Sequence, residues 1–247
     1  MSTEFPLFAN VLFFAITGFL LVITLVGLNR ILVVKAGAHS TANPSAVNRS
    51  LLGWVGGIIL VWLTLLSVMS LNGFFADFMA IPPRVMLAVL VCFLTIFILA
   101  ANKRFAKSLL SLPPSWLIVP QVFRVAVEIV LWLLYENGNT PQQMTFEGLN
   151  FDILAGLSAP VVAYLAFSGG RKNYTLALVW NILSMGLLIN ILTVAVLSMP
   201  LVGAFDDPNT FVSFFPYILL PGFVAPFAMM LHVFSIKQLL KLRKAGS

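Results

Sequence analysis

Seven apolar stretches, each of about 18–26 residues, constrain this 247-residue chain more than any other feature. A helix of about 20 apolar residues crosses a hydrocarbon core roughly 30 Å thick. Because lipid offers backbone groups no hydrogen-bonding partner, each stretch is predicted to be a helix. The sequence therefore predicts an all-α integral membrane protein, a seven-transmembrane-helix bundle that forms one domain over residues 1–247. The predicted spans are residues 6–28, 50–71, 84–101, 116–135, 149–168, 174–198 and 211–236.

The connecting segments alternate in charge along the chain. Segments 29–49, 102–115, 169–173 and 237–247 hold twelve Lys or Arg and no acid, whereas segments 1–5, 72–83, 136–148 and 199–210 hold six Asp or Glu and no base. Basic residues beside spans stay in the cytoplasm, so we expect the N-terminus outside and the C-terminus cytoplasmic. The longest loop, 29–49, is expected to be flexible. The short loops suggest a bacterial inner (plasma) membrane.

The sequence does not contain the residues that several classes of binding site and cofactor require. The net charge of +6 comes from the cytoplasmic segments, where it faces anionic lipid, and no basic patch is interleaved with aromatic residues, so nucleic acid is not an expected partner. One cysteine, two histidines and no His-Glu-x-x-His motif exclude the usual metal and haem sites. Lys237 stands at the inner end of the last span, which excludes a retinal pigment. We predict no cofactor, no metal and no catalytic residue.

Four charged residues remain outside the connecting segments (14 − 12 basic and 8 − 6 acidic): Arg84, Arg124, Glu128 and Asp152. Arg84 and Asp152 are placed near the outer boundary, whereas Arg124 and Glu128 lie inside the fourth span. An ionised group at the bilayer centre costs about 2.5–3.5 kcal/mol. Residues four apart share one helix face, so Arg124 and Glu128 are predicted to form an ion pair within the helix, and Gln121 extends the same stripe.

This predicted pair has two interpretations: a structural ion pair that locks helix packing, or a polar pocket that opens outward. In the second, Arg124 would anchor a negative or carbonyl group through its planar fork, and Glu128 would exchange a proton. Asp152 begins the fifth span, with Asn150 as a helix cap. The candidates for ligand binding or a proton relay are Arg124, Glu128, Asp152, Asn190, Arg84 and Gln121, with Asn190 expected to meet Glu128, and His232 is the candidate for an inner proton exit.

The leading hypothesis is a membrane transporter or small-ligand-binding protein, with a small solute or a proton as its cargo. One alternative is a receptor, scaffold or assembly subunit, whose protein partner the sequence does not identify. A second alternative is an intramembrane enzyme that acts on a lipid or apolar substrate, with Glu128 or Asp152 as general base. The chain offers that enzyme no obvious nucleophile or metal site, so an enzyme is the less favoured class.

Overall fold

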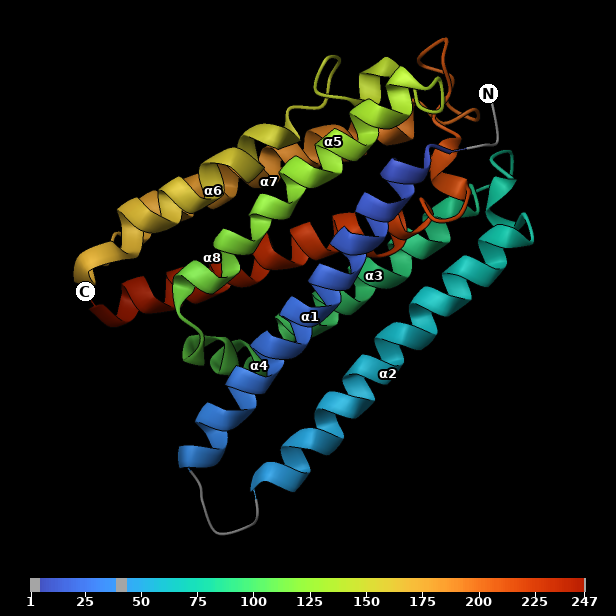
Figure 1. Ribbon diagram of the computed structural model, residues 1–247. Helices are drawn as coiled ribbons and strands as arrows, with labels where there is room; N and C mark the ends of the chain where they lie inside the picture. The colour runs from blue at the N-terminus through green and yellow to red at the C-terminus, as the bar shows by residue number, and fades with distance from the viewer. Residues whose placement is uncertain (1–4, 39–43, 247) are drawn as a thin grey trace.

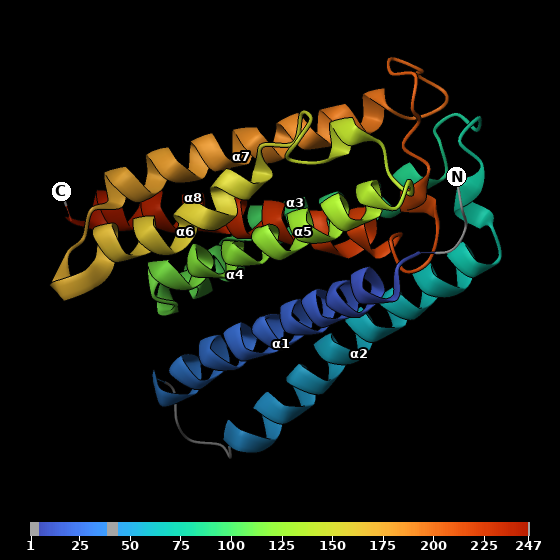
Figure 2. The same ribbon diagram turned by 45° about the horizontal axis from the view of Figure 1, so that its top comes forward.

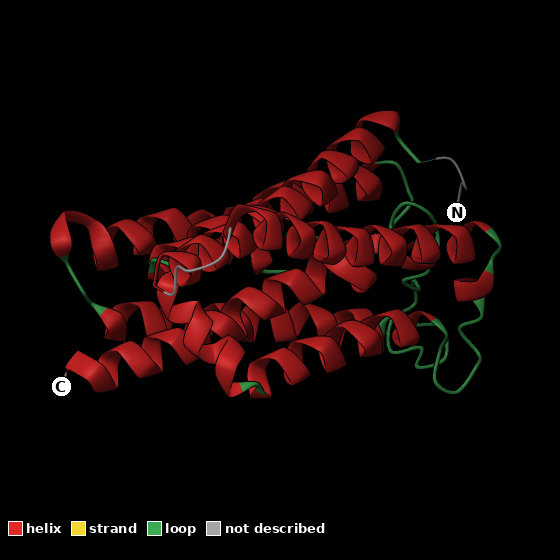
Figure 3. Cartoon of the chain, turned by 90° about the horizontal axis from the view of Figure 1, so that it is seen from below, coloured by secondary structure: helices red, strands yellow, loops and turns green. Residues whose placement is uncertain are grey.

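The chain folds into a bundle of helices, as the computed structural model in Figure 1 shows. The structure describes residues 5–38 and 44–246; helices make up 78% of the structure, and no strand is present in those ranges (Figure 3). The α-helices are α1 (Leu7–Ala38), α2 (Pro44–Leu71), α3 (Val85–Ala101), α4 (Lys103–Ser108), α5 (Phe123–Glu136), α6 (Asp152–Phe167), α7 (Tyr174–Leu197) and α8 (Ala225–Gly246). Shorter helices are η1 (Phe74–Ala76), η2 (Leu109–Ser111), η3 (Pro114–Leu117), η4 (Val119–Val122), η5 (Gln142–Met144), η6 (Ser168–Gly170), η7 (Phe211–Ser213) and the π-helix η8 (Leu220–Val224).

By length and composition, six helical stretches of the described chain could cross a membrane. A seventh is present if α3 and the segment 103–111, which meet at a bend of 72°, count as one span. The first helix begins and the last helix ends at opposite ends of the bundle (Figures 1 and 2). The membrane character that the apolar stretches predict is therefore borne out by the fold.

The first two helices are longer than their apolar stretches. The predicted loop 29–49 is wrong over most of its length, because α1 continues to Ala38 and α2 begins at Pro44. Residues 29–38 contain no proline, so nothing stops α1 where its apolar stretch ends. Pro44 suits the first position of α2, where a missing N–H costs no hydrogen bond. Residues 39–43 of the predicted loop lie outside the described residues.

Prolines decide where two other spans become α-helical. In the fourth span, η3 and η4 precede α5, and Pro120 lacks the N–H that would bond the carbonyl of Trp116. The seventh predicted span contains Pro216, Pro221 and Pro226, and there the chain forms only η7 and η8 before α8 begins. The predicted start of that span at residue 211 is wrong, whereas the break that its prolines predict is confirmed.

The break before α8 is tied to the neighbouring helices through one carbonyl. Pro226 cannot donate the hydrogen bond that Gly222 O would accept in a regular α-helix. Trp62 Nε1 of α2 donates to this oxygen over 2.8 Å, and Cys92 Sγ of α3 donates over 2.9 Å. The carbonyl that Pro226 leaves open thus joins α2 and α3 to the start of the last helix.

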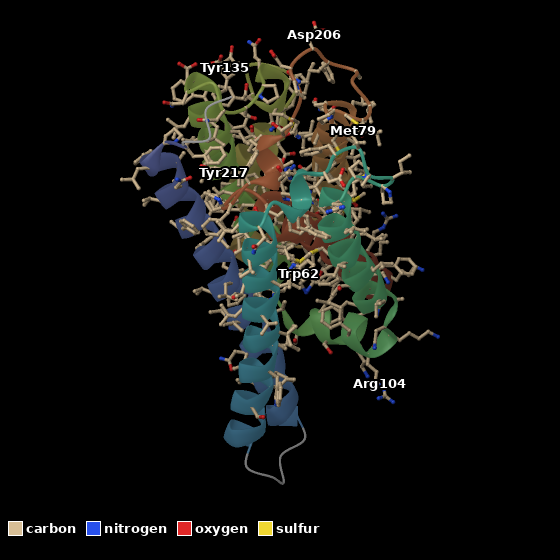
Figure 4. All side chains as sticks on the ribbon, turned by 90° about the vertical axis from the view of Figure 1, so that its right-hand side faces the viewer. Trp62, Met79, Arg104, Tyr135, Asp206 and Tyr217 are labelled. Carbon is tan, nitrogen blue, oxygen red and sulfur yellow. The ribbon has the colours of Figure 1, made fainter. Side chains whose placement is uncertain are left out.

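The acidic and basic connections lie towards opposite ends of the molecule. Figure 4 labels Asp206, between α7 and η7, near one end and Arg104, on α4, towards the other. Asn102 produces the turn into α4, because its Oδ1 accepts hydrogen bonds from the N–H groups of Arg104 (2.9 Å) and Phe105 (3.1 Å). This cap begins α4, and the basic segment that follows is bent by 72° from α3.

Candidate functional site

Helix α6 begins further inside the bundle than the end of α7 beside which it packs. It has 16 residues against 24 in α7, and the segment 137–151 occupies the remaining length beside α7 (Figures 1 and 2). This segment is packed into the protein, with Met144, Thr145 and Asn150 buried. Non-helical backbone at such a depth requires protein or water around it. The segment brings Asn150 and the first residue of α6, Asp152, into the interior.

Arg124 of α5 and Asp152 of α6 form a buried ion pair in this region. Arg124 Nε donates to Asp152 Oδ2 over 2.6 Å, and Nη2 donates to Asp152 Oδ1, so the pair is bidentate. The second N–H of Nη2 points at the carbonyl of Ser184 in α7, 3.4 Å away. The exposed fractions of the two charged residues are only 2% and 6%. A buried pair of this kind needs further hydrogen bonds to offset its loss of hydration.

His232 of α8 provides one of these bonds. Its Nε2 lies 3.0 Å from Arg124 Nη1, and because arginine can only donate, Nε2 is the acceptor. The ring therefore carries its proton on Nδ1, which donates to Asn181 Oδ1 over 3.0 Å. Asn181 Nδ2 continues the network to Ser235 Oγ over 3.0 Å. A second proton on the imidazole would place two cations in contact, so these contacts favour a role for His232 in positioning Arg124.

Glu128, one turn after Arg124 on α5, has a different environment. Its Oε1 accepts a hydrogen bond of 2.6 Å from Asn150 Nδ2. Asn150 is held in turn by the carbonyl of Met144 and by the backbone N–H of Asp152, which donates to Asn150 Oδ1 over 3.1 Å. Asn150 thus satisfies the N–H of the first residue of α6, although the N-cap position of this helix is occupied by Phe151, which makes no side-chain cap bond. Within the described chain, no group donates to Glu128 Oε2, although Glu128 is only 2% exposed.

The expected ion pair between Arg124 and Glu128 is not formed. The guanidinium pairs with Asp152, which offers both oxygens of its carboxylate in the matching fork geometry. Asp152, which was expected near the outer boundary, is only 6% exposed and lies beside Arg124. The late start of α6 sets Asp152 beside Arg124, and helix periodicity alone does not reveal that position.

A cavity of about 80 Å³ adjoins these groups. Arg124, Glu128, Asn150 and Asp152 lie on its wall. The rest of the lining is apolar and comes from Phe123, Val127, Leu131, Met144, Leu188, Ile191, Leu192, Ala195, Val212, Leu220, Pro221, Val224, Ala225 and Ala228. Since about 10–15 Å³ of such volume holds one water molecule, the space is sufficient for a few waters or a solute of similar size.

The other candidates lie at different distances from this cavity. Gln121 is buried and donates to the carbonyl of Ala228 over 3.2 Å, close to the site but outside the cavity lining. Asn190 donates to the carbonyl of Leu149 over 2.7 Å, instead of meeting Glu128. Arg84 pairs with Asp77 at 3.0 Å, where both side chains are about 40% exposed. The structure thus groups His232 with Arg124 and leaves Arg84 outside the site.

Sequence reasoning did not include Asn181, Ser184 or Ser235 in the site. Asn181 and Ser184 on α7 have the same spacing as His232 and Ser235 on α8, three residues apart. Such a spacing sets both polar groups on one face of each helix, so two matching polar faces in apolar spans could have indicated a contact. In the described residues, no group of three or more His, Cys, Asp or Glu side chains is arranged to hold a metal ion.

The polar site lies within the part of the chain that a family model covers. No curated protein and no solved structure matches the chain. The family model spans residues 81–240, which include every residue of the network from Arg124 to Ser235. By this match the chain belongs to the family described as Domain of unknown function (DUF8737).

Proposed function

We propose that this protein is a membrane transporter or small-ligand-binding protein whose site is the cavity beside Arg124, Glu128, Asn150 and Asp152. One observation carries the proposal: Glu128 Oε2 has no donor among the described residues, yet it is buried at the wall of a cavity. A buried acceptor without a partner costs about 1–3 kcal/mol, and more when it is charged. A proton, a water molecule or a bound solute would remove that cost.

The two buried carboxylates of the site, Asp152 and Glu128, differ in their partners, and we assign them different roles. Both oxygens of Asp152 bond to Arg124, so this pair accounts for the structural interpretation of the buried charges. Glu128 has no such partner. Asn150 donates to its Oε1, and no group of the described chain donates to its Oε2. The functional interpretation therefore rests on Glu128, with Arg124 and Asp152 as the support that shapes the wall.

The charges of the site favour proton coupling. Arg124 and Asp152 cancel, so an ionised Glu128 leaves one uncompensated negative charge in the interior. Such a charge is strongly unfavourable in a poorly solvated place. Glu128 can lose this charge by taking up a proton, and a carboxyl group that alternates between the two forms is the element that couples a proton to a solute.

The orientation in the membrane follows from the charge pattern. We place the acidic end, with Asp206, outside and the basic end, with Arg104, in the cytoplasm, since basic residues are retained there. The bent pair of α3 and α4 then counts as one of seven spans, and the N-terminus is outside. The cavity lies between the spans, and the segment 137–151 covers its outer side. The proposed location is a bacterial inner membrane.

The test is proton flux through the purified protein in proteoliposomes under an imposed pH gradient, followed with an enclosed pH-sensitive dye. Glu128→Gln keeps the size of the side chain and an acceptor for Asn150, but it cannot carry a proton. We expect flux to fall at least tenfold. Glu136→Gln, on the exposed end of the same helix, is the matched control and should keep wild-type flux. Unchanged flux in Glu128→Gln would remove the proposed role of this residue.

A further inference from the structure

We propose that the solute of this site is a small ammonium or alkylammonium cation, which displaces a proton from Glu128. This inference rests on the proposed function, and it reverses the expectation that Arg124 anchors an anion. The inference depends on which polar atoms at the cavity already have hydrogen-bond partners in the described chain and on the one acceptor, Glu128 Oε2, that has none.

Arg124 has little capacity left for a ligand. Four of its five N–H donors are directed at Asp152 Oδ2, Asp152 Oδ1, the Ser184 carbonyl and His232 Nε2. An incoming anion would have to compete with Asp152 for the guanidinium, which a bidentate carboxylate already holds. The nearby amino end of α6 is no better for an anion, since the Asp152 carboxylate and Asn150 Oδ1 occupy it.

Glu128 has the opposite property. Its open atom, Oε2, accepts hydrogen bonds and donates none when the carboxylate is ionised. The complementary ligand brings an N–H donor, and a positive charge is favoured because Arg124 and Asp152 already cancel. A monovalent ammonium group supplies both requirements with one nitrogen, whereas a carboxylate, a phosphate or a chloride ion supplies neither.

The remaining walls limit the size and the character of this ligand. The cavity of about 80 Å³ has room for only a few non-hydrogen atoms, and apart from its four polar residues its lining is apolar. Val127 and Leu131 of α5 and Ile191 of α7 offer a surface for a methyl group. Ammonium and methylammonium fit this combination, whereas a bulky quaternary amine exceeds the space.

The same oxygen would then hold either a proton or the cation, but not both. When Glu128 takes up a proton, the group that attracts the ammonium is lost. When the ammonium binds, the proton has left for water. The O–H bond of the carboxyl group breaks as its proton passes to water, and the ammonium ion then takes the place of the proton beside Oε2, so one positive charge replaces another. Mutual exclusion at one atom is sufficient to exchange a proton for the solute when the site opens to the two sides in turn.

The first experiment measures thermal unfolding of the detergent-purified full chain with methylammonium chloride. N-methylglucamine chloride, whose cation is too large for the cavity, is the control for ionic strength. A ligand that binds only the folded state raises the Tm, by about 5 °C or more near a hundredfold excess over its Kd. We expect this rise with methylammonium, and we expect Glu128→Gln to abolish it while Glu136→Gln keeps it. The wild-type comparison requires no variant to fold.

The second experiment replaces the cation by an anion, with N-methylglucamine formate as the probe. A Tm rise with formate, or none with methylammonium, would overturn the cation assignment. If proton flux nevertheless depends on Glu128, the proposed function stands and only its solute changes. If flux is independent of Glu128 and no probe shifts the Tm, both proposals fail. The two readouts therefore distinguish failure of the solute assignment from failure of the site.

Discussion

Two cavities in this bundle differ in size and in the character of their walls, and the smaller one has charged side chains on its wall. The larger has a volume of about 520 Å³ and lies between α1, α2, α3 and the residues around η8. Its lining is almost wholly apolar, and two of its polar side chains, Trp62 and Cys92, already donate to Gly222 O. The smaller cavity, of about 80 Å³, is bordered by three charged side chains. The comparison teaches that buried charge, and not volume, distinguishes the candidate site from the larger cavity.

The two cavities also belong to different parts of the sequence. The family model begins at residue 81, so it covers α3 to most of α8 and excludes α1 and α2. Among the candidate spans, the one in α2 is the least buried, whereas those that contain α5 and α8 are the most buried. The charged cavity therefore belongs to the part that defines the family, and the apolar cavity lies where the first two helices join that part.

The strongest test of this contrast is the loss of one member of the buried ion pair. Arg124→Ala leaves Asp152 buried without its counter-charge, and such losses cost about 3–5 kcal/mol of folding stability. We expect unfolding at a much lower temperature in detergent. Arg84→Ala is the matched control, because the exposed pair of Arg84 with Asp77 is worth only about 0–1 kcal/mol. Equal losses in the two variants would contradict the view that buried charge distinguishes the two regions.

A smaller effect is expected from Gly156, at the contact of α6 with α5. A Cβ atom there would lie 2.8 Å from Val125 Cγ2 and 2.9 Å from Val125 N, so the backbone of α5 would have to move. Overpacking of this kind costs about 1–3 kcal/mol, and we expect Gly156→Ala to lower both the Tm and the flux that depends on Glu128.

The counterpart in the apolar region is Gly222. An added Cβ there would meet Leu66 Cδ1, the end of a flexible side chain, and Ala88 Cβ only at 3.5 Å. Gly222→Ala should therefore cost less stability than Gly156→Ala. Gly57→Ala, with no atom within 4 Å, should be neutral. A greater loss of stability for Gly222→Ala than for Gly156→Ala would show that the contact of α5 with α6 is not the less tolerant one.

The smallest expected effect concerns the apolar cavity itself. Trp62→Phe removes one of two hydrogen bonds to Gly222 O and leaves the bond from Cys92. A net loss of about 1 kcal/mol is expected, measured by denaturant unfolding in detergent. Proton flux that depends on Glu128 should stay unchanged. A large loss of flux in this variant would mean that the two cavities are coupled.

Sequence reasoning identified the helices and the residues with unusual charges, because apolar length and buried charge are local properties. It placed Arg124 and Glu128 on one helix and named Asp152 and His232 as candidates. It paired the wrong residues, since pairing depends on where segment 137–151 sets the start of α6. That position results from tertiary contacts such as those of Asn150, which a pattern along one helix does not contain.

The late start of α6 means that part of the cavity wall is made of turns instead of a helix. On one side, the cavity is lined by the regular helices α5 and α7 and by residues around the start of α8. On the other side, it is closed by segment 137–151, whose backbone is held by short-range turns and by bonds such as that from Gln143 Nε2 to the carbonyl of Asp207. A cover made of turns can be displaced without unwinding a helix. Opening the cavity at this segment therefore requires a smaller rearrangement than moving α5 or α7.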